Sequence, residues 1–372
     1  MDASYPAAPL TVPADLTKPT AEYRRRAAAA VVGLLLFMAA YLGLCFWLGR
    51  VGYRGIRDVF AGEATIVGTA IAIPASFLFI VLIKGLFAVQ RNPMKQLVEV
   101  TIEDEPELLA FIHRVADDAG APRPHRIFLS PRVNAAVFYD VGIGNLLVPT
   151  KKNLEIGLGL VNGLSLDELK AVIAHEFGHF SQRSMGIGSW VYLSQQVVGD
   201  LITRRDALDR FLTGLSYVDI RIAWIGWIMR LLVWALRAVV DQAFRAVILL
   251  NRALGQQMEF AADRVAVSLS GSDSLVHALH RLSAADVAWG RAMGVLIDHA
   301  MRGKSVGDLF AIQTKMIERH RQVHALVGYG ETPSAPPPSE RAAHRVFSRE
   351  LAETPRMWAT HPPNHAREEN CK

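Results

Sequence analysis

The chain has 372 residues, of which 51% are hydrophobic and 20% are charged, and its formal net charge is +5. This balance excludes a disordered chain and favours a membrane protein with a sizeable folded domain. No nucleic-acid-binding motif accompanies the basic residues, so we expect no nucleic-acid partner. The two cysteines, Cys45 and Cys371, do not form a disulfide framework.

The first part of the chain predicts a tail followed by a membrane anchor. Residues 1–26 are polar and begin with several prolines, which indicates a flexible tail, and residues 27–90 form a two-span anchor. The first span, 27–49, is uncharged and long enough to cross a bilayer as a helix. The second span, 64–83, contains Pro74, which transmembrane helices tolerate. Basic residues flank the pair of spans on the outside. The connecting loop carries Arg50, Arg54 and Arg57, but these are offset by Asp58 and Glu63, and this imbalance predicts both termini in the cytoplasm.

A mixed segment follows the anchor. Strands are predicted at 98–102, 126–129, 133–139, 146–148 and 154–160, and an amphipathic helix at 105–116. Together they predict a small sheet that precedes the helix carrying the chemistry. After Ser270 the chain is predicted to be helical until a proline-rich linker at 332–339.

Residues 217–250 are apolar, but Arg230 and Arg237 lie in the middle of the segment. An arginine at the centre of a bilayer is costly, which argues against a simple third span. Trp227 and Trp234 share the helix face of the arginines, a mixture that suits the level of the lipid headgroups. The sequence leaves open whether this helix spans the membrane, lies in its interface or packs as a soluble arm.

The sequence His-Glu-Phe-Gly-His at 175–179 carries the metal chemistry. Ser165 and Glu168 form a capping box, which predicts a helix from about Leu166. Two histidines one helical turn apart project from one face, so both imidazoles can bind the same zinc ion. Glu176 lies between them and can take a proton from a water molecule at the metal and pass it to the leaving amine.

His175 and His179 leave a zinc ion in need of a third protein ligand. The best candidate is Glu259, and Asp263 lies one turn further along the same face. A carboxylate at that position can accept a hydrogen bond from a zinc-binding histidine and fix its ring. The alternative is an ordinary solvated helix face on which these carboxylates pair with Arg264. Zn²⁺ is the cofactor that the ligand types predict, although other divalent ions can substitute for it.

Five short segments of the chain resemble one known family. They are Asn-Ala-Ala at 134–136, Gly-Leu-Val at 159–161, the predicted helix at 168–179, Glu-Phe-Ala-Ala-Asp at 259–263 and Thr-His-Pro-Pro at 360–363. In this order they resemble peptidase family M48, which includes the HtpX-like heat-shock proteases and the CAAX prenyl proteases. The resemblance implies that His175, His179 and Glu259 bind zinc and that Glu176 is the general base.

The resemblance also assigns residues to the substrate. It implies an edge strand at Asn134 and Ala135 that receives an extended peptide and orients the scissile carbonyl over the metal. The family element His-Pro-Pro-x-x-x-Arg matches His361 and Arg367. It implies that His361 donates to the tetrahedral oxyanion and that Arg367 binds substrate or gives structural or electrostatic support. His365 competes as the donor, and the alternative for His361 is a solvated histidine of the tail.

These expectations define an α+β, mostly helical zincin-like metallopeptidase domain with an N-terminal two-helix transmembrane anchor. The catalytic domain would occupy residues 91–331, including a membrane-associated segment at 217–250. Residues 332–372 would form a proline-rich linker and a C-terminal tail with the His-Pro-Pro element.

The expected activity is endoproteolytic hydrolysis of unfolded or membrane-proximal polypeptides. The expected place is the lipid bilayer, as a multi-pass protein of the bacterial inner membrane whose catalytic domain faces the cytoplasm. One alternative is a CAAX-type processing protease of lipid-modified peptides, and another is a non-catalytic zinc-bound membrane scaffold. The oligomeric state is left open.

Overall fold

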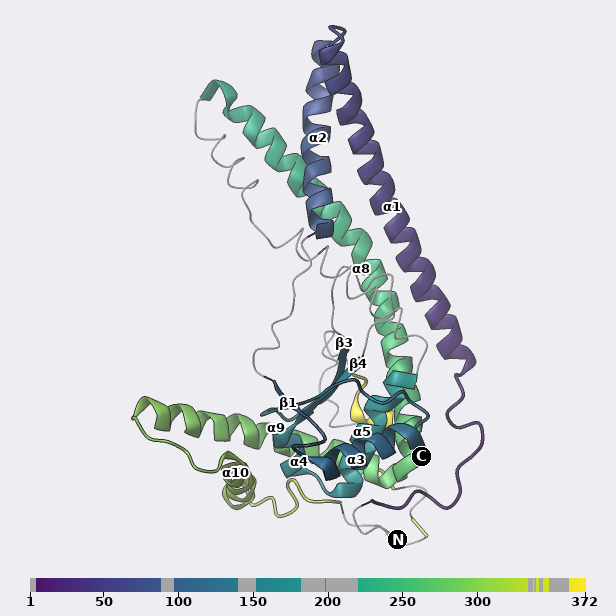
Figure 1. Cartoon of the computed structure of the whole chain (residues 1–372), viewed down its shortest axis with the longest axis vertical. Coiled ribbons are helices and arrows are strands. Elements are labelled where there is room, and N and C mark those ends of the chain that lie inside the picture. The colour runs from purple at the N-terminus through teal and green to yellow at the C-terminus, as the bar shows by residue number, and fades with distance from the viewer. Residues whose placement is uncertain are drawn as a thin grey trace. The chain divides into compact units, whose positions relative to one another are not determined.

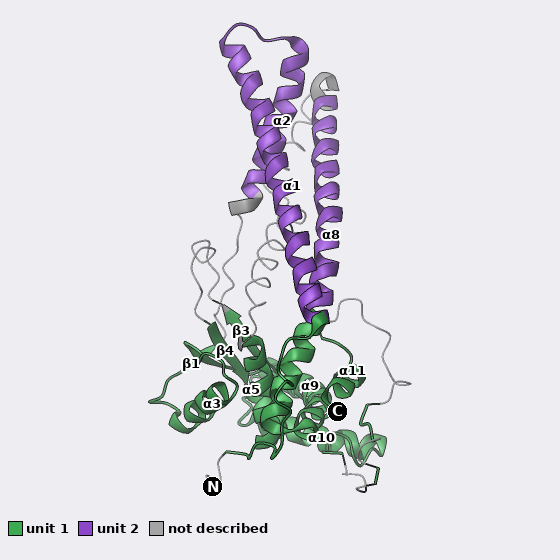
Figure 2. Ribbon diagram, turned by 90° about the vertical axis from the view of Figure 1, so that its right-hand side faces the viewer, with its two compact units in different colours: residues 1–21, 93–185, 255–372 green, residues 22–92, 186–254 purple. Residues whose placement is uncertain are grey.

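A computed structural model of the chain describes residues 5–87, 97–139, 152–181, 198, 220–333, 337, 339–340, 344–347 and 361–372. The chain divides into two compact units, which are distinguished by colour in Figure 2. The sheet unit comprises Met1–Ala21, Pro93–Met185 and Gly255–Lys372. The helical unit comprises Glu22–Asn92 and Gly186–Leu254.

The helical unit begins with two long helices that a short turn connects (Figure 1). α1 runs from Ala21 to Phe60 and α2 from Ile66 to Phe87, so the predicted spans 27–49 and 64–83 fall on them. By length and composition, these two helices are the candidate membrane spans among the described residues. α1 extends past the first predicted span, because no proline interrupts it, and the basic residues expected in a connecting loop are therefore helical.

Close packing sets the register between α1 and α2. A Cβ atom added at Gly52 would lie 2.3 Å from Oγ of Ser76, so the missing side chain lets the two helices approach. Further along, the Tyr41 hydroxyl donates to the carbonyl of Leu82 at 2.8 Å. The apolar run of α2 thus lies beside the second half of α1, and the two predicted spans overlap only in part along the hairpin.

The helix α8, Ile220–Ser270, includes the described part of the arginine-bearing segment. Within the helical unit its buried side chains pack with those of α1 and α2, and the ring centroids of Phe37 and Phe244 are 5.0 Å apart. Its outer face carries exposed tryptophans at positions 224, 227 and 234. From residue 220 onward this segment is therefore one side of a helical bundle, whereas residues 217–219 lie outside the described chain.

The sheet unit contains four described strands in the order β1-β2-β4-β3. Their bounds are Val98–Val100 for β1, Ile127–Ser130 for β2, Ala135–Tyr139 for β3 and Lys152–Gly157 for β4. β4 is parallel to β2 and antiparallel to β3, and β1 is antiparallel to β2. In the described sheet β1 and β3 are the outer strands. The strand predicted at 146–148 lies outside the described residues.

The remaining described helices of the sheet unit differ widely in length. They are α3 at Pro106–Asp118, α4 at Leu158–Gly163, α5 at Leu166–Ser181, α9 at Ser272–Met301, α10 at Leu309–His324 and α11 at Asn364–Cys371. The core lies between the sheet and α3, α5, the end of α8 and α9. The predicted α+β, mostly helical architecture with two N-terminal apolar helices is confirmed.

The strand predicted at 154–160 is wrong in its second half, because β4 ends at Gly157 and α4 follows at once. A Cβ atom at Gly157 would lie 2.1 Å from the carbonyl oxygen of Arg132. The Gly157 N–H donates to the carbonyl of Asn134 at 2.7 Å. This close crossing ends the strand, and the apolar residues that follow pack on α9 as a helix.

The N-terminal segment differs from the predicted flexible tail. α1 already begins at Ala21, so part of the predicted 1–26 tail is helical. Near its start, the Tyr5 hydroxyl donates to Asp118 in α3 at 2.6 Å. The segment is thus held at both ends.

Candidate metal centre

The helix α5 begins with the predicted capping box. The Ser165 N–H donates to Glu168 Oε2 at 2.8 Å, and the Glu168 N–H donates back to Ser165 Oγ at 3.4 Å. Glu168 also accepts from Arg281 of α9 at 2.8 Å. These contacts fix the start of α5 and, because the helix is rigid, the positions of the side chains two to three turns later.

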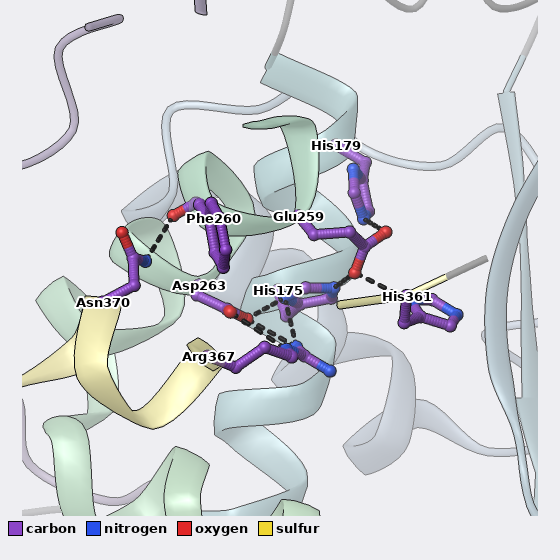
Figure 3. Close-up of polar contacts among 8 residues, drawn as sticks. All are labelled: His175, His179, Glu259, Phe260, Asp263, His361, Arg367 and Asn370. Carbon is purple, nitrogen blue, oxygen red and sulfur yellow. Dashed lines mark hydrogen bonds and ion pairs between the residues drawn. The ribbon is translucent and has the colours of Figure 1, made fainter. Parts of the chain in front are cut away.

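Two histidines of α5 and one glutamate of α8 form a compact group of metal-binding atoms. Nε2 of His175 and Nε2 of His179 each lie 3.4 Å from one of the two carboxylate oxygens of Glu259. The ligand atoms of all three lie within 4.8 Å of one another. Figure 3 shows the carboxylate facing both imidazoles. The three ligands predicted from the sequence are thus brought together by two helices that are far apart in the chain.

The chemistry of this donor set fits a zinc ion. Zinc–nitrogen and zinc–oxygen bonds of about 2.0–2.1 Å in a tetrahedron place neighbouring ligand atoms about 3.4 Å apart. The two nitrogen–oxygen separations of 3.4 Å match that spacing and are long for direct hydrogen bonds. Three protein ligands also leave one position of a tetrahedron for water, as in catalytic rather than structural zinc sites.

Glu176 lies on α5 directly after His175 and is half-buried. It is not part of the ligand group formed by the described residues. A carboxylate that is not itself a ligand can act as a general base towards a water molecule at a metal, and this is the role expected of Glu176.

Asp263 and Arg367 support His175 from the side away from Glu259 (Figure 3). Asp263 is fully buried, and its Oδ1 lies 2.8 Å from His175 Nδ1. Arg367 of α11 donates through Nε to Asp263 Oδ2 at 2.9 Å, and its Nη2 contacts the other carboxylate oxygen and lies 3.3 Å from His175 Nδ1. Asp263 therefore has the geometry predicted for a carboxylate that orients a metal ligand.

The position of Arg367 does not fit the substrate-binding role assigned from the sequence. Its side chain is only 8% exposed, and its donors point at Asp263 and His175. The other role that the resemblance implied, structural and electrostatic support, agrees with this geometry.

His361 is exposed and contacts one of the candidate ligands. Its side chain is 59% exposed, and its Nδ1 is 2.7 Å from Glu259 Oε2. Its rival His365 is half-buried on α11. Of the two candidates, His361 is the one that borders the metal ligands, and its exposed ring leaves room for a reacting group beside it.

Asn134 and Ala135 lie at the start of the outer strand β3. Asn134 is exposed and its carbonyl accepts from Gly157, whereas Ala135 pairs with Ile156 of β4. β3 also contacts α5, which carries the histidines. Among the described strands β3 is thus an outer strand, and it contacts the helix that carries the two histidines.

Hydrogen bonds shift the pKa values of the ligands. Burial disfavours protonation of His175, but the hydrogen bond to Asp263 and the nearby carboxylate of Glu259 outweigh it and raise the pKa of the imidazole to about 9. Burial also disfavours the charged form of Glu259, yet the nearby imidazoles of His175 and His179 and the contact with His361 hold the pKa of this carboxyl far below its usual range. Without a metal, His175 is therefore protonated at neutral pH, and a zinc ion must displace that proton.

Several supporting residues were missed by the sequence reasoning. Asn370 of α11 donates to the carbonyl of Phe260, next to Glu259, at 2.9 Å. Glu368 is fully buried and accepts from the N–H groups of Val346 and Phe347. No spacing signal marks these residues, because their partners lie on other segments of the chain.

Gly178 lies where α5 meets α8. A Cβ atom added there would lie 2.7 Å from Cα of Ala262. The glycine thus allows α5 and α8 to touch between their metal ligands.

Comparison with known proteins identifies a family whose sequence model matches the chain. The model of peptidase family M48 matches residues 103–372. A protease HtpX homolog of Gemmatimonas aurantiaca is 29% identical over 189 residues, covering 49% of this chain and 59% of that protein. A homolog of Persephonella marina is 25% identical over 239 residues, which is 61% of this chain and 77% of that protein.

A third relative covers more of the chain. The protease HtpX of Haemophilus influenzae is 23% identical over 264 residues, which is 67% of this chain and 84% of that protein. No solved structure matches the chain.

Proposed function

Because the chain belongs to peptidase family M48, we propose that it is a membrane-anchored zinc endopeptidase with Glu176 as its general base. The observation that carries the proposal is the convergence of His175, His179 and Glu259, with Glu176 next to His175 on α5. A structural zinc site needs no such extra carboxylate and is normally closed by a fourth protein ligand.

The roles of the residues follow from their positions. A zinc ion held by His175, His179 and Glu259 would supply a Lewis acid that polarises the scissile carbonyl and acidifies water. Glu176 accepts the proton of the attacking water and returns it to the leaving amine. His361, exposed beside Glu259, donates to the carbonyl oxygen as negative charge develops there.

The substrate is proposed to bind as an added strand on β3. An outer strand offers unpaired backbone groups, and an extended peptide can pair with them whatever its sequence. Asn134 and Ala135 would meet this peptide at the start of β3, next to α5. This mode of binding selects for unfolded or membrane-proximal segments, because a folded substrate has no free extended backbone to offer.

The helical unit is proposed to sit in the bilayer. α1 and α2 supply two apolar spans, and the outer face of α8 carries exposed tryptophans beside the arginines of the same segment. Tryptophan and arginine side chains are both suited to the headgroup level. We place the protein in the bacterial inner membrane with the sheet unit in the cytoplasm, following the basic flanks of the spans.

The test compares the purified wild type with Glu176→Gln in detergent. We expect about one zinc ion per chain in both, by elemental analysis, and cleavage of an unfolded protein such as casein by the wild type alone. Gln is isosteric with Glu but cannot accept the proton, so binding is retained while the reaction stops.

The same experiment separates the alternatives. Equal cleavage by the wild type and Glu176→Gln would contradict the general-base role. Zinc in both proteins with cleavage in neither, for casein and for a prenylated CAAX peptide, would favour the zinc-bound scaffold. Cleavage of the prenylated peptide but not of casein would favour the CAAX-type protease.

A further inference from the structure

The first described residues of the chain are bound to the outside of the zinc-binding helix. The Tyr5 hydroxyl donates to Asp118 Oδ2 at 2.6 Å, and its ring meets Phe111 edge-on with centroids 5.6 Å apart. The guanidinium carbon of Arg114 lies 3.8 Å from the centroid of the same ring. Three residues of α3 therefore contact one tyrosine by a hydrogen bond, an aromatic contact and a cation–π contact.

Lys170 of α5 completes the contact from the other side. It is only 1% exposed, and its Nζ donates to the carbonyl of Pro6 at 2.8 Å and lies 4.4 Å from the Tyr5 ring centroid. Burial lowers the pKa of this ammonium group. A buried ammonium is costly unless hydrogen bonds and nearby charges compensate it, and here the tail supplies both an acceptor and an aromatic face.

We propose that Phe111, Arg114, Asp118 and Lys170 form a binding site for a tyrosine–proline peptide segment, which the chain fills with its own Tyr5 and Pro6. The ligand class is set by the contacts. Asp118 accepts a hydrogen bond from a phenol, Arg114 and Lys170 lie against an aromatic face, and Lys170 also donates to a backbone carbonyl one residue later. We call these four residues the tyrosine site.

The tyrosine site includes a residue of α5, the helix that carries His175 and His179. Lys170 and His175 are both on α5, little more than one turn apart. Filling the site orders Lys170 and fixes this part of α5 against α3, while residues 7–20 connect the bound tyrosine to the first membrane helix. The segment that leads into the membrane anchor is thus also a ligand that stiffens the zinc-binding helix. This inference does not depend on the peptidase reaction.

Hydrogen exchange measured by mass spectrometry on the full-length protein in detergent tests the site. In Tyr5→Ala we expect the amides of α3 and of the first turns of α5 to exchange at least about tenfold faster than in the wild type. Tyr5→Phe keeps the ring and loses only the hydrogen bond to Asp118. Its exchange rates should therefore lie between those of the wild type and those of Tyr5→Ala. The matched control is Leu10→Ala, in the same segment but fully exposed, which should match the wild type.

A peptide added in trans identifies the ligand. A synthetic peptide of residues 2–12 should restore protection to the Tyr5→Ala protein, and the same peptide with alanine at position 5 should not. Unchanged exchange in Tyr5→Ala would overturn the site. Protection in the wild type that disappears on dilution would show that a second copy of the chain supplies the tyrosine, and would overturn the intramolecular assignment.

Discussion

Asp263 and Arg367 support the metal centre although neither belongs to the group of candidate ligands. Each is buried, and together they hold the Nδ1 side of His175. Partners of this kind commonly contribute about 10–100-fold to metal affinity or activity. The bidentate geometry of Arg367 on Asp263 is one that lysine cannot reproduce.

We therefore expect Arg367→Lys and Asp263→Asn each to weaken zinc binding by about 10–100-fold. Competition with a fluorescent chelator measures the affinity directly. Arg302→Lys is the matched control, because Arg302 makes an exposed ion pair with Asp298 far along α9. Affinities that match the wild type in both test variants would show that His175 needs no such support.

The raised pKa of His175 predicts how zinc binding depends on pH. After removal of the metal with EDTA the imidazole, whose pKa is about 9, holds a proton that rebinding must release. Between pH 7 and 9 the apparent zinc affinity should rise by up to about tenfold per pH unit and then level off. Calorimetry in buffers of different ionisation enthalpy should count close to one proton per zinc ion at pH 7.5.

The same shift has a consequence for the metal-free protein. A pKa raised in the folded state stabilises the fold fully below the unfolded value of about 6.5, and this stabilisation is lost as the pH rises through about 9. The melting temperature of the EDTA-treated protein should therefore fall between pH 7 and 9. A melting temperature that rises over this interval would contradict the assignment.

At the scale of elements, the contact between α5 and α8 determines the spacing of the ligands. Gly178 stands between His175 and His179, and Ala262 stands between Glu259 and Asp263. The two helices touch at this pair of small residues, where an added Cβ atom would be 2.7 Å from Cα of Ala262. Any side chain at Gly178 must therefore push apart the helices that carry the three ligands.

Gly178→Ala is expected to lower zinc affinity by at least about tenfold and to lower the melting temperature, because overpacking costs about 1–3 kcal/mol. Chelator competition and thermal unfolding measure the two effects. The control is Gly294→Ala in α9, where an added Cβ atom meets nothing within 4 Å and helix propensity predicts a neutral or stabilising change. Equal behaviour of the two variants would mean that α5 and α8 can separate without harm to the centre.

Local sequence patterns predicted some features of the fold and of the site but not those that depend on distant segments. The capping box predicted the start of α5, and the spacing of His175 and His179 predicted that both rings face one side, because helix geometry turns spacing into direction. Glu259 lies on another helix, so no spacing pointed to it, and its selection depended on the family resemblance. The end of β4 at Gly157 was missed, since it depends on the carbonyl of Arg132 from another segment. The burial of Arg367 and the anchoring of Tyr5 were missed for the same reason.

At the scale of the whole molecule, composition predicted a membrane protein, and two apolar helices were found where the hydropathy placed them. The basic flanks of these spans predict the side of the membrane. A C-terminal fusion to green fluorescent protein should fluoresce, and a fusion to alkaline phosphatase at the same place should be inactive. Phosphatase inserted after Gly62, in the turn between α1 and α2, should be active. The reverse pattern would place the metal centre on the outer side.

The length of α1 has a consequence for the kind of membrane that the protein tolerates. A helix of 40 residues is about 60 Å long, twice the hydrocarbon thickness of about 30 Å. Arg50, Arg54 and Arg57 follow the uncharged stretch as exposed side chains, each about one turn beyond the last. In a bilayer that is thicker by one helical turn, about 5.4 Å, Arg50 would be drawn towards the hydrocarbon, where an arginine is costly. We therefore expect a thicker membrane to be met by extension of this side chain back to the headgroups or by local thinning of the bilayer.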